Sequence, residues 1–257
     1  MNSRNKASNR QIKKWRKLQQ GKYRQKEGLF LAEGERCVSQ ILGNRALVVK
    51  ELVVDENFEI TERISSSGLG IYSVSTAELD EITDTENPQG ILAVCRIPEE
   101  RELVDLARKS GILIATDEIQ DPGNLGTILR TAVWFGAAGL LAGKGSVDPW
   151  HPKVVRSTAG ATGVLPIIKG DLRNMLKSLS DEGWEILLLD KGRESENLRE
   201  VKKFEKAVIT VGNEAKGICE DLLGEGWKTV KIGGEMDGVE SLNAAIATGI
   251  ALYHFCR

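Results

Sequence analysis

The sequence predicts an α/β protein in which a mainly parallel sheet carries helices on both faces and follows a smaller α/β domain. From residue 111 onward, short and continuously apolar segments alternate with segments of helical pattern. That alternation is typical of strands buried on both faces of a parallel sheet. The chain has 257 residues, which exceeds one average domain and favours two. Hydrophobic residues make up 41% and charged residues 28%, which is ordinary for a protein with a sizeable buried core.

The first predicted domain comprises residues 1–98 and is a small α/β unit that includes the amino-terminal segment, and the second comprises residues 99–257. A polar segment beginning at Ile97-Pro98 marks the boundary between them. In the first domain we expect strands at 29–32, 47–54, 71–74 and 90–95, and helices at 34–43 and 76–82. In the second we expect strands at 111–116, 138–142, 164–168, 184–189, 207–211 and 228–232, and helices at 124–136, 153–160, 171–181, 217–223 and 241–255.

Basic residues are concentrated at the start of the chain. Residues 1–26 contain ten Lys or Arg and no acidic residue, so with a net charge of −2 the remainder carries −12. A basic arm on an acidic body indicates a polyanionic partner such as RNA, with Trp15 and Tyr23 placed to stack on unpaired bases. A solvated helix face is the alternative interpretation of such a charge run. The candidate RNA contacts are Lys13, Lys14, Arg16, Lys17 and Arg24 in this arm, and Lys153 and Arg156 near the predicted site.

Several classes of protein are disfavoured by the sequence. No apolar run approaches the roughly 20 residues that a membrane helix needs, and the basic start lacks the apolar stretch of a secretory signal. The four cysteines are far apart without metal-ligand spacing, which favours a cytoplasmic protein with reduced thiols and no metal. His151 and His254, the only histidines, lie in no motif with a partner, so a Ser/His/Asp hydrolase is disfavoured.

Three segments at predicted strand ends carry more polar residues and glycines than packing requires. They are residues 117–132, 210–218 and 232–250. Ligands of parallel sheets bind beyond the carboxyl ends of the strands, so we expect the chemistry in these segments. Taken singly, each has a structural interpretation: Asn124 and Ser241 as helix N-caps, Glu214 as a turn residue. None contains a phosphate-binding or dinucleotide-binding glycine motif.

The ordered set of motifs resembles the SpoU/TrmH family of RNA methyltransferases. The three family motifs are matched by NLGTILRTA (124–132), VGNEAKGI (211–218) and ESLNAAIATGIAL (240–252). The stretch KGSVDPWHPKVVRSTAGA (144–161) resembles the family's segment between the first two motifs. The resemblance covers about residues 111–257, and FLAEGERCVSQIL (30–42) more weakly resembles an amino-terminal substrate-binding domain found in many members.

The resemblance implies a deep trefoil knot in the carboxyl-terminal part, a homodimer, and S-adenosylmethionine as the cofactor. Gly212, Ile232 and Leu242 would line the cofactor site, with further contacts from the second motif. One departure concerns the third motif: the family commonly has proline after the position of Ile232, whereas this chain has Gly233 and a loop longer by one residue. The second-motif residues proposed as further cofactor contacts are Thr210, Val211 and Gly217.

The resemblance also implies the reaction, which is methylation of a ribose 2′-hydroxyl in RNA. Arg130 would be the principal catalytic residue, and Asn124 would hold Arg130 or the target phosphate. Glu214, Ser241 and Asn243 would complete the polar pocket. The two-domain layout favours ribosomal RNA over transfer RNA by analogy. Methylation of a base nitrogen, and a non-catalytic RNA- or ribosome-binding role on the same fold, stay as alternatives.

Overall fold

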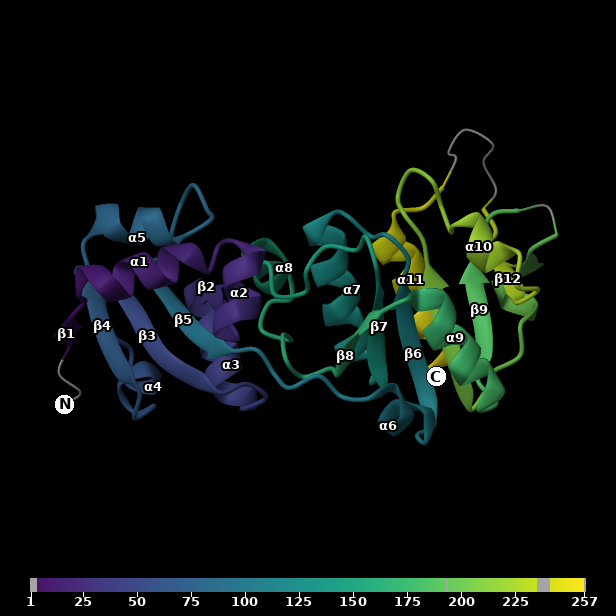
Figure 1. The fold of residues 1–257 in the computed structure, drawn as a ribbon, viewed down its shortest axis with the longest axis horizontal. Helices are drawn as coiled ribbons and strands as arrows, with labels where there is room; N and C mark the ends of the chain where they lie inside the picture. Colours follow the sequence, from purple (N-terminus) through teal and green to yellow (C-terminus); the bar gives the residue numbers. More distant parts are fainter. Residues whose placement is uncertain (1–3, 193, 235–240, 257) are drawn as a thin grey trace. The chain divides into compact units, whose positions relative to one another are not determined.

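A computed structural model describes residues 4–192, 194–234 and 241–256, which divide into two compact units (Figure 1). The first unit comprises residues up to Glu99 together with Asp148–Val164, and the second comprises Glu100–Val147 with the residues from Leu165 onward. Segment 148–164 therefore packs with the first unit, although it interrupts the sequence of the second.

The first unit is built on a mixed sheet with strand order β1-β4-β3-β5-β2. The β3–β4 pair is parallel, while β5 runs antiparallel to both β3 and β2. Its strands are β1 (Asn5–Lys6), β2 (Leu29–Glu33), β3 (Val49–Asp55), β4 (Gly70–Val74) and β5 (Ile91–Arg96). Its helices are α1 (Asn9–Lys17), α2 (Gly21–Glu27), α3 (Glu35–Asn44), α4 (Glu62–Ser65), α5 (Thr76–Ile82) and α8 (Pro152–Ser157).

The second unit is built on a parallel sheet with strand order β10-β12-β9-β11-β6-β7-β8, which confirms the predicted fold class. Its strands are β6 (Gly111–Thr116), β7 (Gly139–Gly143), β8 (Ile167–Gly170), β9 (Glu185–Leu189), β10 (Glu196–Asn197), β11 (Lys206–Val211) and β12 (Lys228–Lys231). Its helices are α6 (Leu103–Ala107), α7 (Pro122–Trp134), α9 (Leu172–Asp181), the 3-10 turn η1 (Leu198–Glu200), α10 (Glu220–Leu223) and α11 (Ala244–Phe255).

Helices cover the parallel sheet on both faces. Leu106 of α6, Leu176 of α9 and Leu222 of α10 share one buried cluster with alternate residues of the strands, such as Leu113 and Val208. Because side chains alternate across a strand, the residues between them face the other side, where α11 contacts β11 and α7. No helix in the described part of the chain is long and apolar enough to cross a membrane.

Side-chain caps explain where several helices begin and end. Ser75 and Glu78 form a reciprocal capping box, which starts α5 at the predicted residue. The last helix was expected to begin at residue 241, but Asn243 caps it and α11 begins at Ala244. The helix expected at 217–223 is shorter because Gly217 has a positive φ of 74° and belongs to a turn.

The basic amino-terminal segment is part of the first unit's core, which corrects the expectation of an appended arm. Ile12, Trp15 and Leu18 are buried in one cluster with residues of β2, β3 and α5. Trp15 is 0% exposed, and its indole Nε1 donates to Glu51 Oε1 at 2.7 Å. A fully buried indole cannot stack on an RNA base, so the role expected for Trp15 is wrong.

Arg24 is also buried, which corrects its assignment as an RNA contact. Its side chain is 2% exposed and donates from Nε and Nη2 to Asp148 Oδ2 at 2.9 and 2.7 Å. Nη1 donates to the carbonyl oxygens of Leu18 and Gln19 at 3.0 and 2.7 Å. Arg24 therefore holds Asp148, the first residue of segment 148–164, against the turn that follows α1.

We predict that Arg24→Ala destabilises the protein by about 3–5 kcal/mol, because it leaves a carboxylate and two carbonyl groups without their buried donor. Arg16→Ala is the matched control: its pair with Glu81 is exposed by 53% and 56%, and its loss should cost less than about 1 kcal/mol. Urea unfolding followed by tryptophan fluorescence measures both. Equal midpoints for the two variants would contradict the structural role of Arg24.

Candidate active site

The three motif segments meet at one edge of the parallel sheet. The first follows β6 and leads into α7, the second follows β11, and the third leads from the loop after β12 into α11. β6 and β11 are parallel neighbours, paired from Gly111–Lys206 to Thr116–Val211. Since the carboxyl ends of parallel strands lie at the same edge, the loops that follow them share that edge.

Asp121, and not Asn124, is the N-cap of α7. Its carboxylate accepts from the backbone N–H of Asn124 at 2.8 Å, and Pro122 occupies the first helical position. The expectation that Asn124 caps this helix is therefore wrong. Because the cap is supplied by Asp121, the side-chain amide of Asn124 is available for other contacts.

The second motif forms a tight loop with Glu214 at its tip. Asn213 and Gly217 exchange two backbone hydrogen bonds of 2.9 Å, and Asn213 Oδ1 accepts from the N–H groups of Ala215 and Lys216. A Cβ on Gly212 would lie 2.3 Å from the carbonyl carbon of Gly217, so only glycine fits there. The loop thus presents Glu214 from a backbone with little freedom.

A chain of hydrogen bonds joins the three motifs, and we call it the amide relay; it comprises Glu214, Asn124 and Asn243. Asn124 Nδ2 donates to Glu214 Oε1 at 2.8 Å, and Asn243 Nδ2 donates to Asn124 Oδ1 at 2.9 Å. Asn243 Oδ1 accepts from the N–H groups of Ala245 and Ile246 at 3.0 and 3.3 Å, which caps α11.

The direction of the amide relay follows from its two ends. A carboxylate can only accept, and the N–H groups at the start of a helix can only donate. Glu214 therefore requires the amino group of Asn124, and α11 requires the oxygen of Asn243. These two requirements orient both amides, so the relay has one consistent arrangement.

Arg130 lies on α7, six residues beyond Asn124, which places it about 9 Å further along the helix axis. Its side chain is exposed and makes no hydrogen bond or ion pair with any residue that the structure describes. The structure thus joins Asn124, Glu214 and Asn243 directly and leaves the guanidinium of Arg130 exposed on the same helix. Ser241 is exposed, and its hydroxyl makes no hydrogen bond within the described ranges.

The residues expected to hold the cofactor follow the same strands. Thr210 and Val211 end β11, Ile232 follows β12 and is half-buried, and Leu242 is 47% exposed beside Asn243 of the relay. Gly233 is exposed, and most of the loop between it and Ser241 (235–240), where the extra residue was noted, lies outside the described residues.

The residues present fit a cofactor that is held by backbone groups. Because neither Gly212 nor Gly217 has a side chain, their backbones approach closely, and this part of the second-motif loop offers only backbone groups to a ligand. The hydroxyl of Thr210 is buried without a hydrogen-bond partner among the described residues, and Leu242 offers an exposed apolar side chain. Glycine backbone together with an apolar contact suits a nucleoside-type ligand.

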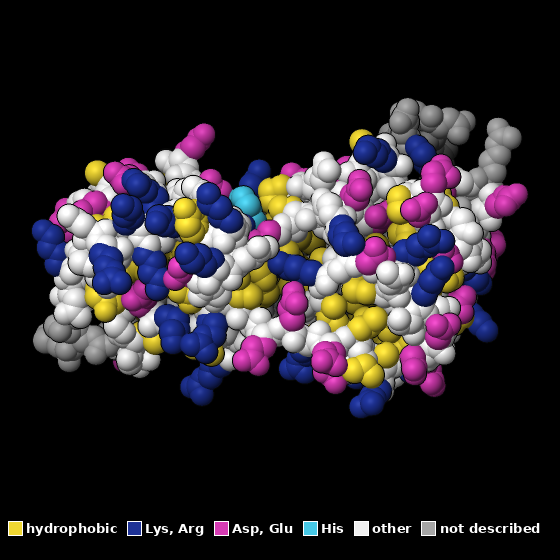
Figure 2. Space-filling view, in the orientation of Figure 1, with side chains coloured by type: hydrophobic (Ala, Val, Ile, Leu, Met, Phe, Trp, Pro, Cys, Tyr) yellow, Lys and Arg dark blue, Asp and Glu magenta, His cyan; other side chains and the backbone are white. Residues whose placement is uncertain are grey.

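The basic residues expected to bind RNA belong to the first unit. Lys and Arg side chains gather over this unit in Figure 2. Lys153 is exposed on α8, whereas Arg156 is partly buried and pairs with Glu33 at 2.7 Å. All four of the basic residues predicted on α1 are exposed, and so is Arg10 of the same helix; the four are Lys13, Lys14, Arg16 and Lys17.

Two residues that support the site were not identified from the sequence. Asp117 is 6% exposed and its Oδ2 accepts from the backbone N–H of Cys219 at 2.8 Å, which ties the end of β6 to the segment after the second motif. Asn213 donates from Nδ2 to the carbonyl of Glu118 at 2.9 Å and thereby anchors the Glu214 loop to the same place. Asp117 directly follows β6 and Asn213 lies two residues after β11, so a polar side chain close to the end of a buried strand was the signal that the sequence offered.

Comparison with known proteins gives one consistent result. The model of the SpoU rRNA methylase family matches residues 111–253, and that of an MRM3-like substrate binding domain matches residues 9–93. The Bacillus subtilis 23S rRNA (guanosine(2553)-2′-O)-methyltransferase RlmP is 34% identical over 256 residues, which cover 96% of each chain. Human mitochondrial rRNA methyltransferase 3 is 28% identical over 295 residues, covering 90% of this chain and 68% of the human one.

A solved structure agrees along almost the whole chain. The AdoMet-bound rRNA methyltransferase from Sinorhizobium meliloti matches with a TM-score of 0.83 at 28% identity, covering 97% of this chain and 95% of that one. With the family model matched over residues 111–253 and a 34% identical relative along nearly its full length, the chain belongs to the SpoU rRNA methylase family.

Proposed function

We propose that this protein transfers a methyl group from S-adenosylmethionine to a ribose 2′-hydroxyl of ribosomal RNA. The observation that carries the proposal is the amide relay, which joins one polar residue from each family motif at the carboxyl edge of the sheet. The ribosomal substrate is supported by the names of the relatives, all three of which are described as rRNA methyltransferases.

The cofactor would be held by the loops that follow β11 and β12 and by the start of the third motif. Gly212 and Gly217 would offer backbone groups, and Ile232 and Leu242 would offer apolar contacts. When bound, S-adenosylmethionine supplies a methyl group that its sulfonium makes electrophilic. Thr210 and Val211 would contribute through the end of β11.

The chemical demand on the protein is activation of a weak nucleophile. A ribose hydroxyl has a pKa far above 7, so its oxygen must be positioned; as the O–CH3 bond forms and the S–CH3 bond breaks, the hydroxyl proton passes to solvent water. Arg130 would bind the target phosphate and place its positive charge beside the 2′-oxygen. That charge favours the alkoxide form and so lowers the pKa of the hydroxyl. A guanidinium keeps its own proton at neutral pH, so this electrostatic role is the one that Arg130 can perform.

The amide relay would act by keeping the site in one arrangement. Glu214, Asn124 and Asn243 fix each other, so their polar atoms need little reorganisation when RNA binds. Ser241, which lies two residues before the cap of α11, would add a hydroxyl to this pocket.

We further propose a homodimer in which α11 packs against a second copy of this chain. Ile246, Ile250 and Tyr253 lie at helical spacing on α11 and are exposed by 54%, 38% and 49%, while Trp134 on the contacting α7 is exposed by 84%. A contiguous exposed apolar stripe of this kind marks a protein interface. The family resemblance supports the same assembly and a deep trefoil knot in the carboxyl-terminal part of the chain.

RNA would bind through the exposed lysines of α1 and through Lys153.

The protein would act in the cytoplasm. Its four cysteines form no disulfide, which suits a reducing compartment; they are Cys37, Cys95, Cys219 and Cys256.

Replacing Arg130 with Ala should lower methyl transfer about 10²–10³-fold or more, because one charge that stabilises the transition state is removed. Affinity for S-adenosylmethionine, measured by calorimetry, should change little. Transfer of a tritiated methyl group to ribosomal RNA measures the rate, and nuclease digestion with mass spectrometry locates the methyl group.

Arg108→Ala is the matched control, because Arg108 ends α6 just before the amino end of β6, at the opposite edge of the sheet. Undiminished transfer by Arg130→Ala would refute the role of Arg130. A methyl group on a base nitrogen, or cofactor binding without transfer by the wild type, would refute the proposed reaction.

The RNA surface can be tested by neutralising two lysines of α1. The Lys13→Ala/Lys17→Ala variant should bind RNA more weakly. The slope of log affinity against log salt concentration should be smaller in magnitude by about 1.4–1.8, because two phosphate contacts are lost. Fluorescence anisotropy at several salt concentrations measures both. Lys202→Ala/Lys203→Ala, exposed in the second unit, should leave the slope unchanged. An unchanged slope in the α1 variant would remove this helix from the RNA-binding surface.

The dimer can be tested by placing charge on the apolar stripe. Ile246→Glu/Ile250→Glu should elute as a monomer of 28.2 kDa in size-exclusion chromatography with light scattering, whereas the wild type should have twice that mass. Val48→Glu, at an apolar residue exposed by 56% in the first unit, should leave the mass unchanged. A wild-type protein that is monomeric at micromolar concentration would contradict the proposal.

A further inference from the structure

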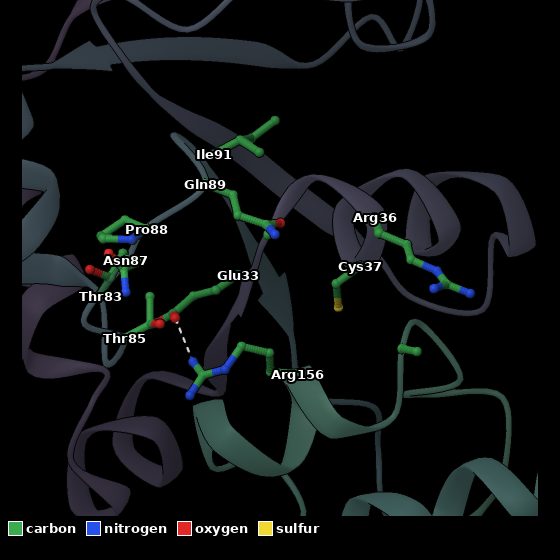
Figure 3. Close-up of a pocket in the computed structure, with 12 residues that line it drawn as sticks. Glu33, Arg36, Cys37, Thr83, Thr85, Asn87, Pro88, Gln89, Ile91 and Arg156 are labelled. Atoms are coloured by element: carbon green, nitrogen blue, oxygen red, sulfur yellow. Dashed lines mark hydrogen bonds and ion pairs between the residues drawn. The ribbon is translucent and has the colours of Figure 1, made fainter.

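The first unit contains a cavity of about 210 Å³ that plays no part in the reaction proposed above (Figure 3). At roughly 30 Å³ per molecule it holds about seven waters, which is space for one planar ring system. Its walls come from β2, α3, the segment between α5 and β5, and α8. The polar residues of its walls include Glu33, Thr83, Asn87, Gln89 and Arg156, and the apolar ones include Pro88 and Ile91.

A buried carboxylate faces this cavity. Glu33 is 3% exposed; its Oε1 accepts from the backbone N–H of Asp84 at 2.9 Å, and its Oε2 accepts from Arg156 Nη1 at 2.7 Å. Burial raises the pKa of Glu33, while the Asp84 N–H and the charge of Arg156 act against that rise. Each carboxylate oxygen has two lone pairs, so each can accept one more hydrogen bond.

Other polar groups on the cavity walls also have hydrogen-bonding capacity that no described residue satisfies. The hydroxyl of Thr83 is buried and has no hydrogen-bond partner among the described residues. Gln89 accepts at Oε1 from the N–H of Glu35 at 3.0 Å, which leaves its amino group with no partner in the described part of the chain. Asn87 is exposed at the rim. An ion pair that served only to hold α8 against β2 would need none of these groups.

The hydrogen-bond donors and acceptors on the cavity walls determine which planar ligand fits the cavity. A carboxylate with two free lone pairs binds best to two adjacent N–H donors, and among the RNA bases only guanine presents these, at N1 and N2. Its O6 accepts hydrogen bonds, and the guanidinium of Arg156 and the amino group of Gln89 are donors. Ile91 and Pro88 supply apolar surface. Adenine, cytosine and uracil each place an acceptor where guanine has one of the two donors.

We propose that this cavity binds an unstacked guanine base of the RNA substrate, with Glu33 accepting from N1 and N2 and with Arg156 and Gln89 donating to O6. The assignment rests on the proposed function for the identity of the substrate as RNA. Bases that leave the stack are the usual targets of sequence-specific RNA recognition, because their Watson–Crick edges become accessible. The first unit thus reads one base, while its exposed lysines bind phosphates.

The test compares two fluorescein-labelled RNA octamers, (UG)₄ and (UI)₄, where I is inosine, which lacks the N2 amino group. Full-length wild type should bind (UG)₄ about tenfold more tightly by anisotropy, the worth of one hydrogen bond to a charged group. Glu33→Gln should bind both octamers equally. Gln89→Leu changes an exposed residue and leaves the Glu33–Arg156 pair intact. It should lower the affinity for both octamers equally, because guanine and the base of inosine share the O6 acceptor. Gln40→Ala, an exposed glutamine of α3 outside the cavity, should behave as wild type.

Equal binding of the two octamers by the wild type overturns the proposal, and so does a preference that persists in a folded Glu33→Gln. If that variant does not fold, full affinity of Gln89→Leu for (UG)₄ overturns it. Competition by guanosine 5′-monophosphate tests whether the bound base belongs to RNA or to a free nucleotide. Displacement of (UG)₄ only at millimolar nucleotide concentration supports an RNA base. Displacement at micromolar concentration overturns the proposal in favour of a free nucleotide. Methyl transfer to ribosomal RNA is assayed separately, so the failure of either proposal is visible without the other.

Discussion

The hydrogen bond between Asn124 and Glu214 is the contact on which the candidate site depends. It joins residues 90 positions apart, and the bond from Asn243 to Asn124 spans 119 positions. Each amide has one correct orientation, set by the carboxylate at one end and by the start of α11 at the other. Loss of any member would remove the hydrogen bond that orients its neighbour, and the polar groups released would turn to solvent, because Glu214 and Asn243 are exposed. The relay therefore couples the folding of three distant segments to the geometry of one site.

The architecture of the second unit was predictable because it depends on local patterns. Continuous apolar runs such as 111–116 and helical patterns such as 171–181 have one stable arrangement, a parallel sheet covered on both faces. The motifs also placed Asn124, Glu214 and Asn243 in one site. Their hydrogen bonds could not be predicted, because the cap of α7 had to be assigned to Asp121 before the amide of Asn124 was available. Competition between two candidate capping residues three positions apart is settled by backbone geometry.

The amino-terminal segment carries two patterns that predict different structures. Its ten basic residues predict a basic arm, whereas Ile12, Trp15 and Leu18 recur every three residues, which is the apolar stripe of a packed helix. The apolar stripe decides the structure, because these three side chains are buried while the basic side chains of α1 stay exposed. The burial of Arg24 carried no such signal, because its partner Asp148 lies 124 residues away in a segment that interrupts the second unit.

Arginine and lysine have different roles in the first unit: two arginines form structural ion pairs, and the lysines of α1 are exposed. Arg24 and Arg156 bind Asp148 and Glu33, and these two pairs hold the start and the middle of segment 148–164 on the unit. Arginine suits this role because its planar fork makes several directed bonds and its charge persists when it is buried. Three of the five exposed basic residues of α1 are lysines, whose mobile ammonium groups suit phosphates that carry no sequence information. The positive charge available to the proposed RNA surface is therefore smaller than the count of basic residues suggests, and the proposed selectivity for guanine would come from enclosed groups such as Glu33.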